Sequence, residues 1–195
     1  MKLPRLTAFA IFIFLLACSI PVLAQQGHDP AALIAAQREA MAPLAMMDGV
    51  WRGPAWTILP SGQKHSITQT ERIGPFLDGS VKVLEGRGYE ADGKVTFNAL
   101  GILSYNPATR AYTLHSHAHG RSGDFPLKTT ADGYVWETPG GGNATVRYTA
   151  VIKDGNWHEV GDRIVPGQAP VRFFEMTLKR IGDNTWPAAG AVPHK

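Results

Sequence analysis

Turn sequences at near-regular spacing are the feature that most constrains the fold of this 195-residue chain. They separate runs that are rich in β-branched and aromatic residues, and they include Asp92-Gly93, Asn106-Pro107 and Asp154-Gly155. Such punctuation is typical of consecutive β-hairpins. No pattern of helical period interrupts the runs, which argues against alternating strands and helices. The pattern therefore predicts an all-β domain.

Ten strands are expected between these turns, and a meander of ten strands is most simply a single up-and-down antiparallel β-barrel. Closure of the barrel hides every strand edge, and a barrel with more than eight strands has room inside for a ligand. The predicted strands are Val50–Ile58, His65–Ile73, Ser80–Tyr89, Val95–Tyr105, Ala111–His119, Asp124–Thr129, Gly133–Glu137, Ala144–Lys153, Asn156–Ile164 and Val171–Arg180.

The first residues have the pattern of an export signal. Lys2 and Arg5 precede the apolar stretch 8–17, and small residues then lead to a cleavage site after Ala24. The apolar stretch is too short for a stable transmembrane helix. Residues 1–24 are therefore interpreted as a signal peptide of a periplasmic or secreted protein, with no membrane span. Lipidation of Cys18 is the alternative.

Cleavage after Ala24 would remove the single cysteine, so the exported chain would contain no disulfide and no cysteine ligand or nucleophile. It would also lower the formal net charge from +3 to +1, because the leader carries two basic and no acidic residues. The remaining chain has no basic stripe, which argues against nucleic acid as a partner.

The rest of the chain divides into three segments. Residues 25–47 are predicted to form a short helix and lead-in, since Asp29 is suited to cap a helix that begins with Pro30, and Pro43 would end or kink it. Residues 48–180 are predicted to form the barrel. Residues 181–195 contain small residues and proline and are expected to be a disordered tail.

A structural plug is expected at one end of the barrel. Trp51 lies in the first predicted strand, within Gly49-Val50-Trp51-Arg52-Gly53, and Arg180 ends the last. The indole of Trp51 can close the cylinder while the guanidinium of Arg180 stacks on it, a cation–π contact worth roughly 0.5–2 kcal/mol.

Five short motifs resemble the DUF1579 family of uncharacterised, exported bacterial proteins, within the lipocalin-like or calycin group of β-barrels. They are Gly49–Gly53, Thr68–Arg72, Phe76–Gly79, Gly101–Asn106 and Phe174–Arg180. The resemblance implies a barrel with an interior cavity and supplies no activity. A more distant similarity is to nitrobindin-type haem barrels, which bind haem through a late histidine; the late strand here contains His158, in a different sequence context.

Three histidines alternate along one predicted strand, at His115, His117 and His119. Alternate side chains of a strand share a face, so two of these imidazoles could approach one metal ion such as zinc. The same face could instead line the cavity or face solvent. The three alternatives remain open on the sequence alone.

The sequence predicts a binding protein and not an enzyme, since the chain contains none of the common catalytic motifs. The expected partner is a small, partly apolar molecule, and the protein is expected to be a monomer or homodimer without a required cofactor. Zinc or haem, with or without catalysis, is the alternative. The expected apolar lining is Phe97, Leu103, Tyr148, Phe174 and Met176, and the expected polar ligand contacts are Glu71, Arg87, His117, Trp136, Arg147 and Glu159.

Overall fold

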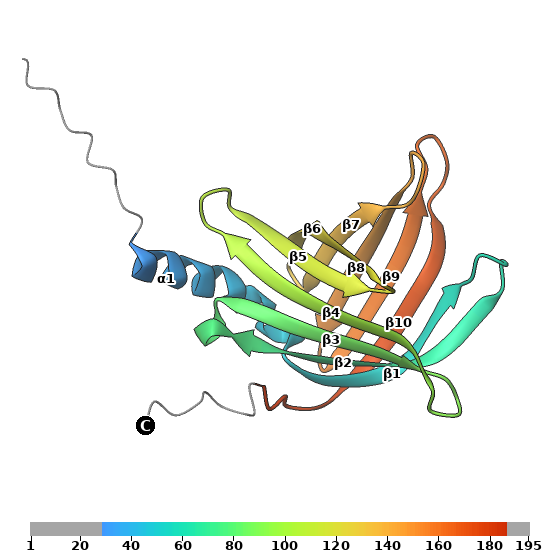
Figure 1. Cartoon of the computed structure of the whole chain (residues 1–195), viewed down its shortest axis with the longest axis horizontal. Coiled ribbons are helices and arrows are strands. Elements are labelled where there is room, and N and C mark those ends of the chain that lie inside the picture. Colours follow the sequence, from blue (N-terminus) through green and yellow to red (C-terminus); the bar gives the residue numbers. More distant parts are fainter. Residues whose placement is uncertain (1–28, 187–195) are drawn as a thin grey trace, which may run out of the picture.

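Ten antiparallel strands close into one barrel in the computed structural model, which describes residues 29–186 (Figure 1). Each strand pairs with its sequence neighbours, and β1 pairs with β10 to complete the cylinder. The prediction of a lipocalin-like, up-and-down barrel with a short N-terminal helix is confirmed. The strands are β1 Gly49–Ile58, β2 Lys64–Phe76, β3 Val81–Tyr89, β4 Val95–Asn106, β5 Ala111–Ala118, β6 Arg121–Thr130, β7 Gly133–Pro139, β8 Thr145–Lys153, β9 Asn156–Ile164 and β10 Val171–Gly182.

Two of the hairpins have two-residue loops in which both residues adopt positive φ. These loops are His119-Gly120, with φ of 52° and 72°, and Asp154-Gly155, with φ of 52° and 69°. This backbone is that of a type I′ turn, whose twist matches the twist of paired strands. The first loop ends β5 at Ala118, so His119 lies in a turn and not in the strand that was predicted to contain it.

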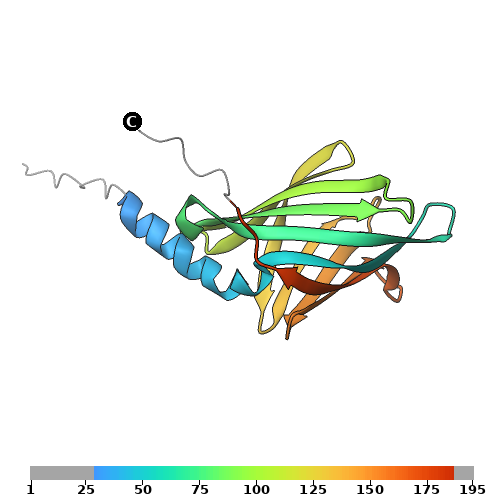
Figure 2. The same cartoon turned by 90° about the horizontal axis from the view of Figure 1, so that it is seen from below.

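A helix, α1 (Pro30–Met41), precedes the barrel and begins as the sequence predicts. Asp29 Oδ1 accepts a hydrogen bond from Ala31 N at 3.0 Å, and Pro30 occupies the first turn. At Pro43 the helix gives way to a 3₁₀ helix, η1 (Ala42–Met47). Figure 2 shows both beside one end of the barrel, near the short 3₁₀ turn η2 (Leu77–Gly79).

That end of the barrel is filled by the tightest part of the core. The seven largest fully buried side chains are at most 2% exposed: Leu44, Met47, Trp51, Ile73, Leu103, Trp157 and Leu178. The Trp51 ring meets the Trp157 ring edge-on, with centroids 5.6 Å apart, and its Nε1 donates to Met47 O at 2.9 Å. The hydrogen bond holds η1 against β1, and the buried side chains of both elements close this end of the barrel.

The predicted cation–π contact between Trp51 and Arg180 is wrong, although the two residues are paired across β1 and β10. Arg180 Nε donates to Asp48 O at 3.1 Å, and its guanidinium also binds the Asp183 carboxylate. In the described part of the chain the cations over aromatic rings are Lys64 and Arg72. Available backbone and carboxylate acceptors hold Arg180 at the rim, and a second indole contacts Trp51.

The predicted disordered tail is also wrong for its first six residues. Ile181 and Gly182 extend β10, and Asn184 and Trp186 contact residues of β2. There the Asn184 amide donates to Ile73 O, and Arg72 lies over the Trp186 ring, 3.8 Å from its centroid. Residues 187–195 lie outside the described residues, as does the predicted signal peptide with Cys18.

Within residues 29–186, no helix has both the length and the apolar character needed to cross a membrane.

Candidate functional site

A cavity of about 760 Å³ occupies the barrel between the closed end and the opposite mouth. Its wall comes from β1 to β5 and β7 to β10, with Leu127 from β6 and Met47 of η1 at the closed end. The residues at the mouth include Leu59, His65, Glu90, Thr96, Phe97 and His119. The volume lies within the range typical of small-molecule sites.

Small inward residues on three neighbouring strands leave this space. On β4, alternation places Phe97, Ala99, Gly101 and Leu103 in the wall, while Leu100 between them is 43% exposed on the outside. Small side chains occupy further inward positions at Gly86, Ser116 and Ala118. Bulky side chains at these inward positions would fill the barrel, so the small side chains there account for the cavity.

Aromatic side chains form the opposite side of the cavity. Trp136 and Tyr148 stack with centroids 4.3 Å apart and an angle of 10° between their planes. Phe174 and Phe173 meet Tyr148 edge-on at 5.8 and 6.1 Å. These rings offer a broad apolar surface to a bound molecule.

Glu159 of β9 is a buried carboxylate in this wall, with 6% of the residue exposed. Tyr134 Oη donates to Glu159 Oε2 at 2.7 Å, and Trp136 Nε1 donates to Oε1 at 3.3 Å. Burial raises the pKa of Glu159 above its ordinary value, while the hydrogen bonds from Tyr134 and Trp136 oppose the rise. The donors therefore favour the charged form and fix the direction of the carboxylate.

Glu71 of β2 is a second carboxylate in the cavity wall, with a different environment. Gln69 Nε2 donates to its Oε1 at 2.7 Å, and the carboxylate lies over Gly86, where a Cβ would come within 2.7 Å of it. Burial raises the pKa of Glu71 from 4.5 to about 8, helped by the charges of Glu159 and Glu85 and opposed by Gln69. Glu71 is therefore mostly protonated at neutral pH.

The ionisable residues of the described cavity wall are glutamates, histidines and tyrosines, with neither lysine nor arginine among them. Two histidines lie at the mouth, where His65 Nε2 is 3.0 Å from Glu90 Oε1. The deeper part contains Glu71 and Glu159. The interior is thus apolar over most of its surface and carries its acidic groups in one polar cluster. We call this the acidic cluster: Glu71, Glu159, Gln69, Tyr134 and Trp136.

Three of the six predicted polar contacts lie in the cavity wall, namely Glu71, Trp136 and Glu159. All five predicted apolar lining residues lie there too. Their contact with a ligand stays a prediction. Tyr134, Gln69 and Trp157 were missed, although Tyr134 and Gln69 stand two residues from Trp136 and Glu71 and so share their faces.

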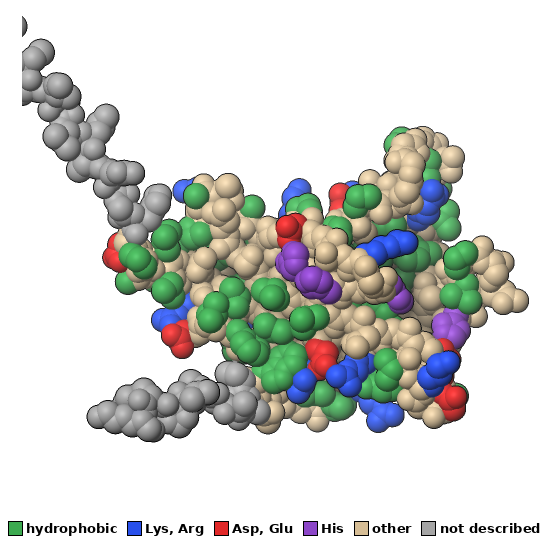
Figure 3. Space-filling view, in the orientation of Figure 1, with side chains coloured by type: hydrophobic (Ala, Val, Ile, Leu, Met, Phe, Trp, Pro, Cys, Tyr) green, Lys and Arg blue, Asp and Glu red, His purple; other side chains and the backbone are tan. Residues whose placement is uncertain are grey.

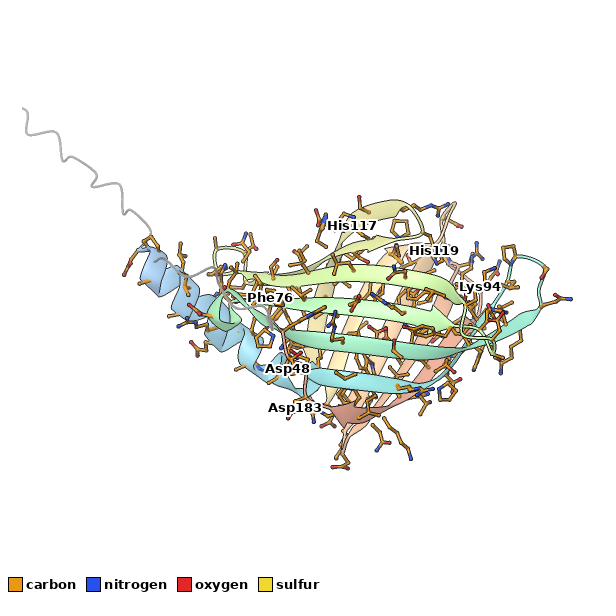
Figure 4. All side chains as sticks on the ribbon, turned by 60° about the horizontal axis from the view of Figure 1, so that its bottom comes forward. Asp48, Phe76, Lys94, His117, His119 and Asp183 are labelled. Atoms are coloured by element: carbon orange, nitrogen blue, oxygen red, sulfur yellow. The ribbon has the colours of Figure 1, made fainter. Side chains whose placement is uncertain are left out.

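The interior positions predicted for Arg87, His117 and Arg147 are wrong. Arg87 lies outside and donates to Glu85 Oε1 at 2.6 Å, and Arg147 donates to Glu137 Oε1, also at 2.6 Å. Each of the three follows or precedes an inward residue, so alternation directs it outward. Figure 4 shows His117 projecting from the outer wall and His119 near the mouth, toward the end that carries Lys94.

The three histidines of the predicted strand do not share one site. His115 and His117 lie on the outer face with Nε2 atoms 3.0 Å apart, and His115 Nδ1 is 2.5 Å from Asp124 Oδ1. Figure 3 shows histidine and hydrophobic side chains close together on the outside of the barrel. His119 instead contacts Phe97, with ring centroids 5.3 Å apart. Residues 29–186 contain no group of three or more side chains placed to hold a metal ion.

His158 does not suit the role of a haem ligand. Its side chain is 48% exposed on the outside of β9, where Nε2 lies 3.3 Å from Glu175 Oε1. Its neighbours Trp157 and Glu159 face the cavity, so alternation carries His158 away from it. Haem bound in the cavity could not use this histidine.

Comparison with known proteins is informative at the level of the fold. No protein-family model matches the chain, and no curated protein sequence matches it. The barrel is similar to the crystal structure of Rv2717c from M. tuberculosis, with a TM-score of 0.55 and 14% identity, over 73% of this chain and 97% of that one. It is also similar to the S-type phycobiliprotein lyase CPES from Guillardia theta, with a TM-score of 0.48 and 13% identity, over 71% and 90% of the two chains. The similarity to Rv2717c supports the lipocalin-like barrel and extends no further than the fold.

Proposed function

We propose that this chain is an exported β-barrel of the DUF1579 type that binds a small, largely apolar molecule with a polar end. The observation that carries the proposal is the cavity of about 760 Å³, with aromatic walls and a hydrogen-bonded carboxylate at 6% exposure. A buried carboxylate is costly unless it has partners, so its presence in an otherwise apolar cavity favours a binding role.

Affinity would come mainly from the apolar wall, and orientation from the acidic cluster. Burial of apolar surface contributes about 25 cal/mol per Å². The stacked pair Trp136 and Tyr148 supplies a flat surface for a ring or chain, and Glu159 supplies a fixed acceptor. A molecule that is apolar along its length and polar at one end would satisfy both parts of the wall.

A variant that fills the cavity tests this function. Ala99→Trp places an indole inside the barrel, and we expect it to weaken binding of the neutral dye N-phenyl-1-naphthylamine at least about tenfold, because the space for the dye is lost. The measurement is a fluorescence titration of the dye. Leu100→Trp adds the same side chain on the outside and should leave the dye affinity unchanged.

The two variants also define the failure of the proposal. Wild-type protein that does not enhance the dye's fluorescence, or equal affinities for the two folded variants, would contradict binding within the barrel. Native mass spectrometry of freshly purified wild-type protein is the second test: a co-purifying small molecule that Ala99→Trp loses and Leu100→Trp keeps is the expected result.

A further inference from the structure

The charge of the cavity wall restricts the chemistry of the ligand's polar end. The acidic cluster contains two carboxyl groups, of Glu71 and Glu159, while the described wall contains no lysine or arginine that could pair with them. A carboxylate or phosphate on a ligand would be repelled at this position. A cationic group would be attracted, and the low dielectric of the cavity would strengthen that attraction.

We propose, on the basis of the binding function above, that the polar end of the ligand is a protonated amine held by Glu159 and Glu71 against the aromatic wall. The ligand class is therefore an apolar amine. An alcohol of the same shape could accept or donate a hydrogen bond but would not neutralise the carboxylates.

Glu159 has the geometry of the principal contact. Its two oxygens each accept one hydrogen bond from the protein, from Tyr134 at 2.7 Å and Trp136 at 3.3 Å. A carboxylate oxygen can accept two, so each retains acceptor capacity for a ligand N–H. Because Tyr134 and Trp136 hold the carboxylate in place, little freedom is lost when an ammonium binds.

Aromatic rings next to these carboxylates favour the same group. Trp157 meets the Tyr134 ring edge-on with centroids 6.2 Å apart, and Trp136 stacks on Tyr148. The face of an aromatic ring attracts a cation, and sites for substituted ammonium groups are commonly built from such rings. The apolar wall, the aromatic rings and the carboxyl groups therefore all favour the same ligand class, an amine with a hydrophobic body.

Binding of an ammonium should depend on pH in a defined direction. The titratable groups around the acidic cluster are Glu71 on β2, Tyr134 on β7, Tyr148 on β8 and Glu159 on β9, with Glu85 of β3 on the outer side of the wall. Burial raises the pKa of Glu71 to about 8, so an approaching ammonium would displace its proton. Affinity should increase from pH 6 to about 8.5, and it should decrease again near the ordinary amine pKa of about 10.

Three probes with one apolar body and different polar ends separate the possibilities. They are 1-naphthylmethylamine, 1-naphthylmethanol and the carboxylate of 1-naphthaleneacetic acid (the acetate), each titrated by calorimetry at pH 7.5. We expect the amine to bind at least about tenfold more tightly than the alcohol, because it alone forms a charge pair in the cavity. The acetate should bind more weakly than either. Titrations of the amine in buffers with different ionisation enthalpies should show release of protons.

Glu159→Gln keeps the size of the side chain and removes its charge. We expect this variant to bind the amine and the alcohol with nearly equal affinity, and to retain its affinity for the alcohol. Glu137→Gln is the matched control, because Glu137 lies outside the barrel with Arg147 and should leave the amine preference intact. Glu71→Gln serves as the second variant should Glu159→Gln not fold, and it should abolish proton release.

The outcomes distinguish this inference from the function on which it rests. If none of the probes binds, and the neutral dye does not bind either, the binding function itself fails. If the alcohol or acetate binds as tightly as the amine, the barrel still binds small molecules but the assignment of an amine is wrong. An amine preference that survives Glu159→Gln and Glu71→Gln would also overturn it.

Discussion

Replacing Trp51 by alanine is expected to lower the free energy of unfolding by about 3–5 kcal/mol, the range for large aromatic truncations in a core. The side chain is 1% exposed and lies at the closed end of the barrel. Three interactions are lost together: the packing of the indole, its edge-on contact with Trp157, and the hydrogen bond from Nε1 to Met47 O. The last loss also removes a hydrogen bond that links η1 to β1.

Urea unfolding followed by circular dichroism measures this effect. Trp56→Ala is the matched control, since Trp56 belongs to the same strand but is only partly buried at the mouth, under Lys64. We expect it to cost about 1 kcal/mol, because less surface leaves contact with protein. Similar losses for the two variants would mean that the closed end is not the part of the barrel on which stability depends.

The barrel could be predicted because the turn residues in the sequence mark where each strand ends and the next one begins. Asp154-Gly155 illustrates this, since a sequence that favours two consecutive positive φ values specifies both the place and the type of a hairpin loop. The same logic explains an error. His119 precedes Gly120 in such a loop, so β5 ends at Ala118, one residue before the last histidine that was assigned to the strand.

The candidate site could be predicted only in part, because a strand's inward face depends on its register in the closed sheet. Glu71 and Glu159 were found as charges within apolar strands. The same criterion also selected Arg87 and Arg147, which alternation places outside with Glu85 and Glu137 as partners. A charged residue within an apolar strand can therefore face either the cavity or the solvent. Its face is shown by the residues two positions away on the same strand, since these share its side of the sheet.

Contacts between strands distant in sequence were the least predictable. Trp51 and Arg180 were expected to be neighbours, and they are paired across β1 and β10. Whether their side chains touch depended on the other interaction partners near each of them. Trp157 from β9 provided a better partner for the indole, and Asp48 and Asp183 provided acceptors for the guanidinium. Strand pairing follows from the pattern, whereas the choice among nearby partners does not.

The stability of the protein should decrease between pH 5 and pH 9 because of Glu71. Burial raises the pKa of Glu71 from 4.5 to about 8 in the folded state, so the folded protein keeps a proton that the unfolded chain has lost. The contribution of this group is complete below about pH 4.5 and is lost as the pH rises through 8. The full shift corresponds to at most about 5 kcal/mol, and water in the open cavity reduces the expected loss to about 2–4 kcal/mol.

Glu71→Gln should remove most of that pH dependence, and the variant should be more stable than the wild type at pH 9 by about 2–4 kcal/mol, since an amide never has to ionise in the cavity. Urea unfolding at intervals from pH 5 to pH 9 measures how the free energy of unfolding changes with pH in the wild type and in Glu71→Gln.

Glu85→Gln is a control with the opposite expected effect on stability. Burial raises the pKa of Glu85, but Arg87 and Arg72 together lower it below its ordinary value. Its loss should destabilise the protein at neutral pH, because two arginines lose their partner. Parallel pH profiles for wild type and Glu71→Gln would contradict a protonated Glu71, and with it the proton release expected when an amine binds.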